Sequence, residues 1–137
     1  MKKNAIKRFA IISPSPIKGS GGVARIFKFA GELAKSGFET DVYVFDSGAG
    51  GEENIKSQAL DFYGASGFRI ICSANIVGEY DFAMATRWDT ARLVRDSAAD
   101  HKLYLVQDFE ASFNPVGDGT ILAENSYLYG LQVITYG

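Results

Sequence analysis

The strongest constraint on the fold is a regular alternation between short apolar runs and segments with helical periodicity. Residues Arg8–Ser13 form an apolar run typical of a buried strand, and a stretch rich in proline and glycine follows. From Val23 the apolar positions are 23, 26, 27, 30, 33 and 34, which is the spacing of one helical face. Gly37 stands where helices commonly end, and Asp41–Phe45 is the next apolar run.

The same alternation continues along the chain. Further strands are expected at Phe68–Cys72, Tyr80–Ala85, Leu103–Val106 and Leu131–Thr135, and further helices at Ile55–Tyr63, Ala91–Val94 and Ile121–Tyr129. Thr86–Asp89 resembles a helix capping box, with Asp in place of the usual Glu or Gln. Apolar strands that alternate with helices predict an α/β fold, a Rossmann-like doubly wound parallel sheet with helices on both faces. The length of 137 residues fits one domain.

Composition and charge exclude several classes of protein. With 47% apolar residues the chain has enough material for a core, and no apolar run approaches the length of a membrane span. The lone cysteine, Cys72, excludes an internal disulfide framework and is expected to pack as an apolar side chain. We therefore expect a cytoplasmic protein.

The charge is distributed unevenly. Residues 1–31 hold seven Lys and Arg and no acid, whereas the remainder holds seven basic and sixteen acidic residues. The basic start of the chain could attract phosphates or an anionic membrane surface, and the second would place the protein peripherally at the inner membrane face. The alternative is a solvated terminus without a binding role. Because the rest of the chain is acidic, nucleic acid is not expected as a partner.

Ligands of open parallel sheets lie at the carboxyl ends of the strands. This rule selects four connecting segments: Ser13–Gly22, Asp46–Gly51, Thr86–Asp89 and Gln107–Asn114. In the first segment Lys18 is followed by the pair Gly21 and Gly22, where glycine allows close backbone approach and a helix start offers amides to an anion. The segment is not a dinucleotide fingerprint, because position 24 is alanine, and it is not a phosphate loop. The alternative is a flexible turn.

The third segment places Arg87, Trp88 and Asp89 after the expected fourth strand. The arginine is suited to a phosphate or carboxylate, and the indole ring of Trp88 is suited to stacking on a sugar. The alternative is a helix cap with the tryptophan packed on the surface.

The fourth segment places Gln107, Asp108 and Glu110 directly after a strand. Carboxylates bind sugar hydroxyls well and can act as a general base, so Asp108 and Glu110 are the candidate catalytic residues. The alternative is loop capping and salt bridging. His101 is expected on the surface, in a turn at the opposite end of a strand. No metal-ligand spacing and no catalytic triad are recognisable, so neither a metal nor another cofactor is expected.

Two groups of residues resemble a known family. The glycine pair, the following helix and Leu33-Ala34-Lys35-Ser36-Gly37-Phe38-Glu39-Thr40-Asp41-Val42 resemble the N-terminal half of family 4 glycosyltransferases, although Phe38 replaces the usual histidine. Tyr104–Glu110 and Leu122–Tyr127 resemble the rhamnosyltransferase-type branch that builds bacterial surface polysaccharides. Together these segments span most of the chain, but only the first half of such an enzyme.

This resemblance implies a GT-B architecture in which residues 1–137 form the acceptor-side domain, with a donor-binding domain outside this chain. The implied activity is transfer of a sugar, with rhamnose as one candidate, from a nucleotide sugar to a glycan or lipid-linked acceptor with retention of configuration. Gly21 and Gly22 would face the donor phosphates, and Arg87, Asp108 and Glu110 would line the cleft. The cleft histidine of the family has no match here. A fragment of this kind is expected to be inactive alone.

Two other interpretations stay open. The length alone suffices for a stand-alone Rossmann-like or flavodoxin-like ligand-binding module. An oxidoreductase domain is a third interpretation, against which the missing dinucleotide fingerprint argues.

Overall fold

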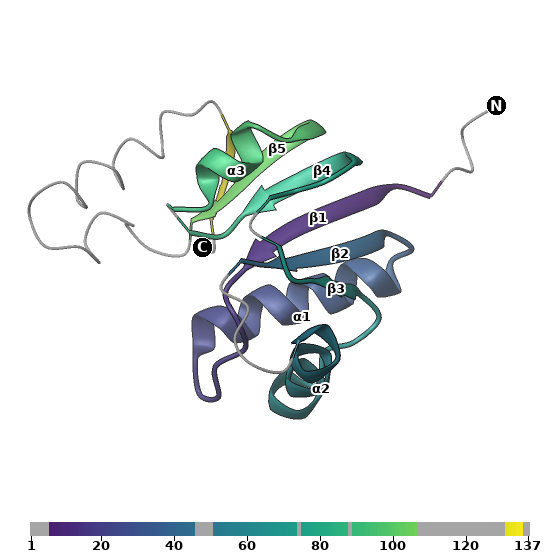
Figure 1. The fold of residues 1–137 in the computed structure, drawn as a ribbon, viewed down its shortest axis with the longest axis vertical. Coiled ribbons are helices and arrows are strands. Elements are labelled where there is room, and N and C mark those ends of the chain that lie inside the picture. The colour runs from purple at the N-terminus through teal and green to yellow at the C-terminus, as the bar shows by residue number, and fades with distance from the viewer. Residues whose placement is uncertain (1–5, 46–50, 74, 88, 107–130, 136–137) are drawn as a thin grey trace, which may run out of the picture.

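The structure is a computed structural model, and it describes residues 6–45, 51–73, 75–87, 89–106 and 131–135. Six strands and three helices are defined within these residues (Figure 1). In chain order they are β1 (Arg8–Ser13), α1 (Gly21–Lys35), β2 (Glu39–Val44), α2 (Gly51–Tyr63), β3 (Arg69–Ile71), β4 (Glu79–Ala85), α3 (Ala91–Arg95), β5 (Ala98–Val106) and β6 (Gln132–Thr135).

The six strands form a single parallel sheet in the order β3-β2-β1-β4-β5-β6. This is the order of the doubly wound dinucleotide-binding fold. The predicted Rossmann-like α/β architecture is therefore confirmed. In Figure 1 the strands β1, β4 and β5 begin on the right and run to the left.

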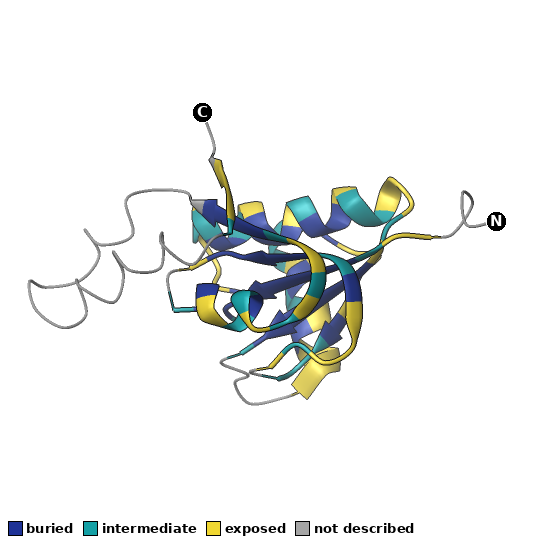
Figure 2. Cartoon of the chain, turned by 90° about the horizontal axis from the view of Figure 1, so that it is seen from above, coloured by how far each residue is buried: buried dark blue, intermediate teal, exposed yellow. Residues whose placement is uncertain are grey.

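Helices cover both faces of the sheet, as predicted. The helices α1 and α2 lie together on one face, and α3 lies on the other face beside β4 and β5 (Figure 1). Alternate residues of β1 point into two separate cores: Phe9 and Ile11 into the core beneath α1 and α2, and Ala10 and Ile12 into the core beneath α3. Figure 2 shows that the central strands are buried, while the edge strand β6 and the outer sides of the helices are exposed.

The first helix follows directly from its sequence. Val23, Ile26, Phe27 and Ala30 recur at helical spacing and are all buried against the sheet. The helix ends before Gly37, whose φ of 100° is a left-handed conformation that glycine adopts without strain. The predicted helix is confirmed, and it starts two residues earlier than its apolar pattern.

Strand β5 is longer than its apolar run. It begins at Ala98 rather than Leu103, so that His101 lies within a strand and not in a turn. The imidazole ring stacks on Phe82 of β4 at a centroid distance of 5.0 Å, and pairing with β4 extends the strand through polar residues. The predicted turn is wrong, whereas the predicted surface position of His101 is confirmed. Cys72 is half-buried against the core beneath α1 and α2.

Candidate functional site

The chain changes direction within the sheet between β1 and β4. Strand β1 pairs with β2 on one side and with β4 on the other, so that successive connections lead away from this point in opposite directions. Crevices at the carboxyl ends of such strands are the usual ligand sites of this fold. We call the residues around the ends of these two strands, 14–22 and 86–90, the switch-point site.

The first part of the switch-point site is the turn that leads into α1. The Ser20 amide donates to the carbonyl of Ile17 over 3.1 Å, which closes a turn in which Gly19 has a φ of 85°. The Ser20 hydroxyl then caps α1 by accepting from the amide of Val23 over 3.3 Å. The sequence therefore builds the helix start from a glycine turn and a serine cap.

The two predicted site glycines lie in the first turn of α1 rather than in the loop. Helix α1 begins at Gly21 because Ser20 is its cap. A Cβ atom placed on Gly21 would meet nothing within 4 Å, so the space beside this residue is open. The first turn holds no acidic residue that would compensate the positive end of the helix dipole. This arrangement is open to an anion or a hydroxyl group at the crevice.

The second part of the switch-point site is the turn after β4. The buried Thr86 hydroxyl donates to the Ile12 carbonyl over 2.6 Å, which ties the end of β4 to the end of β1. The Thr90 hydroxyl accepts from the amides of Thr86 and Arg87 and donates to the Arg87 carbonyl. The capping box predicted at Thr86 is wrong: the helix begins five residues later, and Thr86 bonds across the sheet instead.

Arg87 extends from this turn over the edge of the sheet. Its guanidinium carbon lies 5.5 Å from the ring centre of Phe45, which follows β2, so the side chain crosses above the end of β1. The guanidinium also pairs with the carboxylate of Asp89 at 3.1 Å. The other carboxylate oxygen of Asp89 is buried and has no hydrogen-bond partner among the described residues. The structure thus brings Arg87 and Asp89 together at the crevice.

The other predicted site residues divide into two groups. Lys18 is exposed on the turn before α1 and forms no ion pair with the part of the chain that the structure describes. Trp88, Gln107, Asp108 and Glu110 lie outside the described residues, so the two candidate catalytic carboxylates are not placed. Sequence reasoning missed Phe45 and Thr90, because their contacts join segments far apart in the chain.

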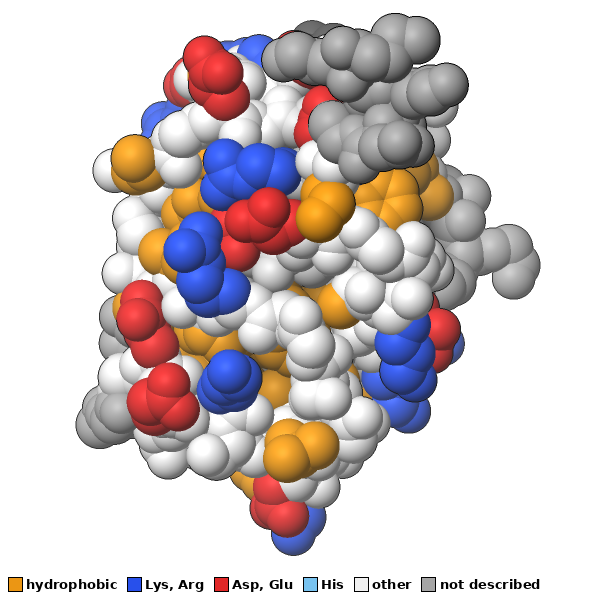
Figure 3. Space-filling view, turned by 90° about the vertical axis from the view of Figure 1, so that its right-hand side faces the viewer, with side chains coloured by type: hydrophobic (Ala, Val, Ile, Leu, Met, Phe, Trp, Pro, Cys, Tyr) orange, Lys and Arg blue, Asp and Glu red, His pale blue; other side chains and the backbone are white. Residues whose placement is uncertain are grey.

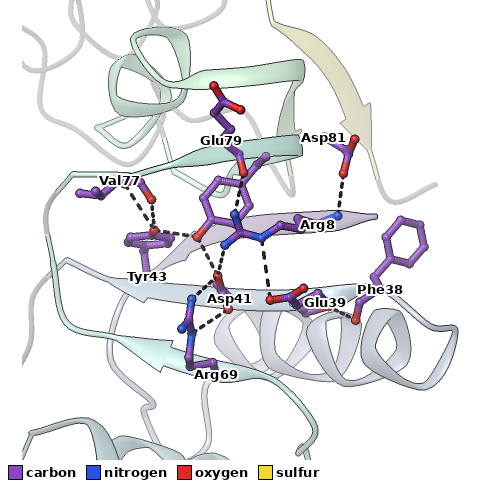
Figure 4. A network of polar contacts seen from close by, with 11 residues as sticks. Arg8, Phe38, Glu39, Asp41, Tyr43, Arg69, Val77, Glu79 and Asp81 are labelled. Carbon is purple, nitrogen blue, oxygen red and sulfur yellow. Dashed lines mark hydrogen bonds and ion pairs between the residues drawn. The ribbon is translucent and has the colours of Figure 1, made fainter. Parts of the chain in front are cut away.

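A second polar cluster lies at the opposite, amino end of the sheet. Its centre is Asp41 of β2, whose side chain is only 2% exposed (Figure 4). The carboxylate accepts two bonds from Arg69 of β3, at 3.1 and 2.9 Å, one from Tyr80 of β4 at 2.7 Å and one from Arg8 of β1 at 3.4 Å. We call these four residues, together with Tyr43, the Asp41 network.

The Asp41 network has marked electrostatic effects. The hydrogen bond from Arg69 to Asp41 raises the pKa of that guanidinium. Burial, together with the hydrogen bonds to Tyr43 and Asp41, raises the pKa of the Tyr80 phenol. Figure 3 looks onto this end of the molecule and shows basic and acidic side chains next to one another. Since its charges are already paired and lie at the amino ends of the strands, the network is structural.

A groove of about 570 Å³ runs beside the edge strand β3, between that strand and the start of α2. It is lined by Glu52, Glu53, Lys56 and residues 67–71. This groove is separate from the switch-point site. Within the described residues no group of three His, Cys, Asp or Glu side chains could hold a metal ion. No helix among those residues is long and apolar enough to cross a membrane.

Comparisons with known proteins leave the family open. No protein-family model matches the chain, and no curated protein matches it. A solved structure that it resembles is a crystal structure of a mutant of MtNAS in complex with S-adenosylmethionine, at 15% sequence identity and a TM-score of 0.44. That match covers 85% of this chain and 46% of the MtNAS chain, so the chain spans about half of that protein.

Proposed function

We propose that the chain is the N-terminal, acceptor-side domain of a retaining GT-B glycosyltransferase that acts on a glycan or lipid-linked acceptor. The main observation in support is the switch-point site. It combines an uncompensated helix start beside Gly21 with an arginine–carboxylate pair, Arg87 and Asp89, at the carboxyl edge of a parallel sheet. The resemblance of the glycine pair and of Tyr104–Glu110 to family 4 enzymes supports the same proposal.

Each part of the switch-point site has a role in this function. Gly21 leaves room for the phosphates of a nucleotide sugar that a second domain holds across the cleft, and Gly22 follows it in the first turn of α1. The partly exposed Asp89 carboxylate and the Arg87 guanidinium together offer acceptors and donors for sugar hydroxyls or an acceptor phosphate. Asp108 and Glu110 are the proposed catalytic carboxylates. No metal or other cofactor enters the proposal.

The first experiment is an NMR titration of the chain with a rhamnose oligosaccharide and, separately, with a nucleotide sugar and its free nucleotide. We expect amide shifts at Gly21, Arg87 and Asp108 with the oligosaccharide. We expect only weak binding of the free nucleotide, because the donor domain would be missing. Tight nucleotide binding by this chain would instead support a stand-alone Rossmann-like module, which the complete strand order of the dinucleotide-binding fold favours.

The contribution of Arg87 is tested by the variant Arg87→Met. A matched control is Arg95→Met, since Arg95 also forms an exposed pair with a nearby carboxylate, Asp96, at 2.9 Å. That pair lies at the end of α3, away from the carboxyl edge of β1 and β4. We expect Arg87→Met to weaken oligosaccharide binding about tenfold, as loss of a charged hydrogen bond would. Equal binding by both variants would remove Arg87 from the site.

The membrane part of the proposal has its own test. If the lipid-linked acceptor lies at the inner membrane face, the basic residues before position 32 should bind the chain to anionic vesicles. Sedimentation with vesicles containing phosphatidylglycerol should depend on salt concentration. Recovery of all the protein in the supernatant at low salt would restrict the proposal to a water-soluble glycan acceptor.

A further inference from the structure

A tyrosine on α2 contacts the backbone of the switch-point site. The Tyr63 hydroxyl donates to the carbonyl of Ile17 over 2.6 Å and accepts from the amide of the same residue over 2.9 Å. The two residues are 46 positions apart, so α2 is fixed to the turn before α1 through one hydroxyl group. Both backbone groups of Ile17 are satisfied by this one side chain.

The contact between Tyr63 and Ile17 also helps to position the start of α1. The Ile17 carbonyl that accepts from Tyr63 also accepts from the Ser20 amide, and it closes the turn that places the serine cap. A shift of Ile17 would therefore move Ser20 and, with it, the first turn of α1 at Gly21. The contact therefore acts on the site through the backbone of Ile17.

The ring of Tyr63 is held independently of its hydroxyl. It stacks on Phe27 of α1 at a centroid distance of 5.7 Å, and Phe62 packs edge-on to it at 6.0 Å. Phe27 is fully buried, so this stacking belongs to the core beneath α1 and α2. Removal of the hydroxyl would leave the ring in place and release only the turn.

We propose that Tyr63 is a positioning residue of the switch-point site, which holds the turn at Ile17 in the conformation that contacts the ligand. This inference rests on the function proposed above, because that function makes the turn a ligand-binding element. The sequence pattern predicts for Tyr63 only a position on the apolar face of a helix. Its role follows from the pair of hydrogen bonds to one distant backbone unit.

The test compares Tyr63→Phe with a matched variant, Tyr43→Phe. The Tyr43 hydroxyl also donates to the carbonyl and accepts from the amide of one distant residue, Val77, over 3.0 and 3.3 Å. Val77 precedes β4, at the opposite end of the sheet from the site. Because Tyr43 also bonds to Tyr80, its variant should lose at least as much thermal stability as Tyr63→Phe.

Two measurements are made on wild type and both variants. Amide hydrogen exchange followed by NMR should show at least about tenfold lower protection at Ile17 and Ser20 in Tyr63→Phe alone. Binding of the rhamnose oligosaccharide should weaken about tenfold, which corresponds to about 1.4 kcal/mol, in Tyr63→Phe and not in Tyr43→Phe. A purely structural role would weaken binding in both variants in proportion to their loss of stability.

Each outcome has a definite meaning. Unchanged protection at Ile17, or oligosaccharide binding equal to wild type, overturns the role of Tyr63. If the wild-type chain binds no oligosaccharide, the proposed function fails. Tyr63 is then not a positioning residue for that ligand, even if hydrogen exchange shows that its hydroxyl protects the amides of the turn. Loss of both protection and affinity in Tyr63→Phe alone supports the inference.

Discussion

The substitution Asp41→Asn tests whether the Asp41 network holds the sheet together. Its carboxylate is the common acceptor for side chains from β1, β3 and β4, while Asp41 itself lies on β2. The amide is nearly isosteric, so the change leaves packing intact and removes only the charge and one acceptor. The new amide group would also direct hydrogens toward the guanidinium of Arg69.

The expected loss of stability depends on the burial of Asp41 and on the exposure of its partners. Removal of one partner of a fully buried ion pair lowers the free energy of unfolding by about 3–5 kcal/mol. Here Asp41 is 2% exposed, but the side chains of Arg69 and Arg8 are 63% and 34% exposed and can turn toward water. Tyr80 is buried and would keep an acceptor in the remaining amide oxygen. We therefore expect a loss of about 2–3 kcal/mol in the free energy of unfolding.

Urea denaturation followed by circular dichroism measures this loss. A suitable control is Asp61→Asn, because Asp61 is exposed on α2 and should change stability by less than about 0.5 kcal/mol. The denaturant slope should stay constant, since the unfolded state is unaffected. If both variants unfold at the same urea concentration, the carboxylate does not hold the four strands and our reasoning fails.

Three further predictions concern stability. Thr86→Val removes the 2.6 Å bond to the Ile12 carbonyl, and it should lower the free energy of unfolding by about 1–2 kcal/mol in urea titrations; no change would mean that this hydrogen bond does not stabilise the fold. Gly67→Ala should cost about 1–3 kcal/mol by the same assay, because Gly67 has a φ of 96° and a new Cβ would lie 3.1 Å from Ala34; wild-type stability would show that the turn rearranges freely. Because the folded pKa of Tyr80 is raised above the unfolded value of about 10, its contribution is complete below pH 10 and is lost as the pH rises further. Stability measured between pH 9 and about 11.5 should fall less steeply in Tyr80→Phe, and parallel curves would contradict this prediction.

The layout of the fold could be predicted from sequence because it depends on local patterns. The bounds of β1 at Arg8–Ser13 agree with the apolar run, and the face of α1 follows from the spacing of its apolar residues. The rule that ligands lie at the carboxyl ends of strands then selected the segments around Gly21 and Arg87. Each of these steps needs only neighbours in sequence or a general property of parallel sheets.

The contacts that fix the site could not be predicted, because each joins residues that are distant in sequence. Thr86 looked like a helix cap, yet its hydroxyl bonds to Ile12, 74 residues away. Asp41 looked like the polar start of a strand and proved to be the centre of a four-strand network. Likewise, the extension of β5 through His101 depends on pairing with β4, which overrides the polar local sequence.

The polar side chains at the two ends of the sheet differ in burial and in how fully they are hydrogen-bonded, and this difference supports a ligand site at the carboxyl end. At the amino end, the buried Asp41 carboxylate already accepts from Arg8, Arg69 and Tyr80, so a ligand that displaced one of them would leave this buried charge less well paired. At the carboxyl end, Arg87 and Asp89 are 44% and 32% exposed, and the backbone at Gly21 is open. An exposed ion pair of this kind contributes little to stability, so its groups can be redirected to a ligand at low cost. We therefore propose that a ligand binds at the switch-point site, and that the Asp41 network holds together the strands that form it.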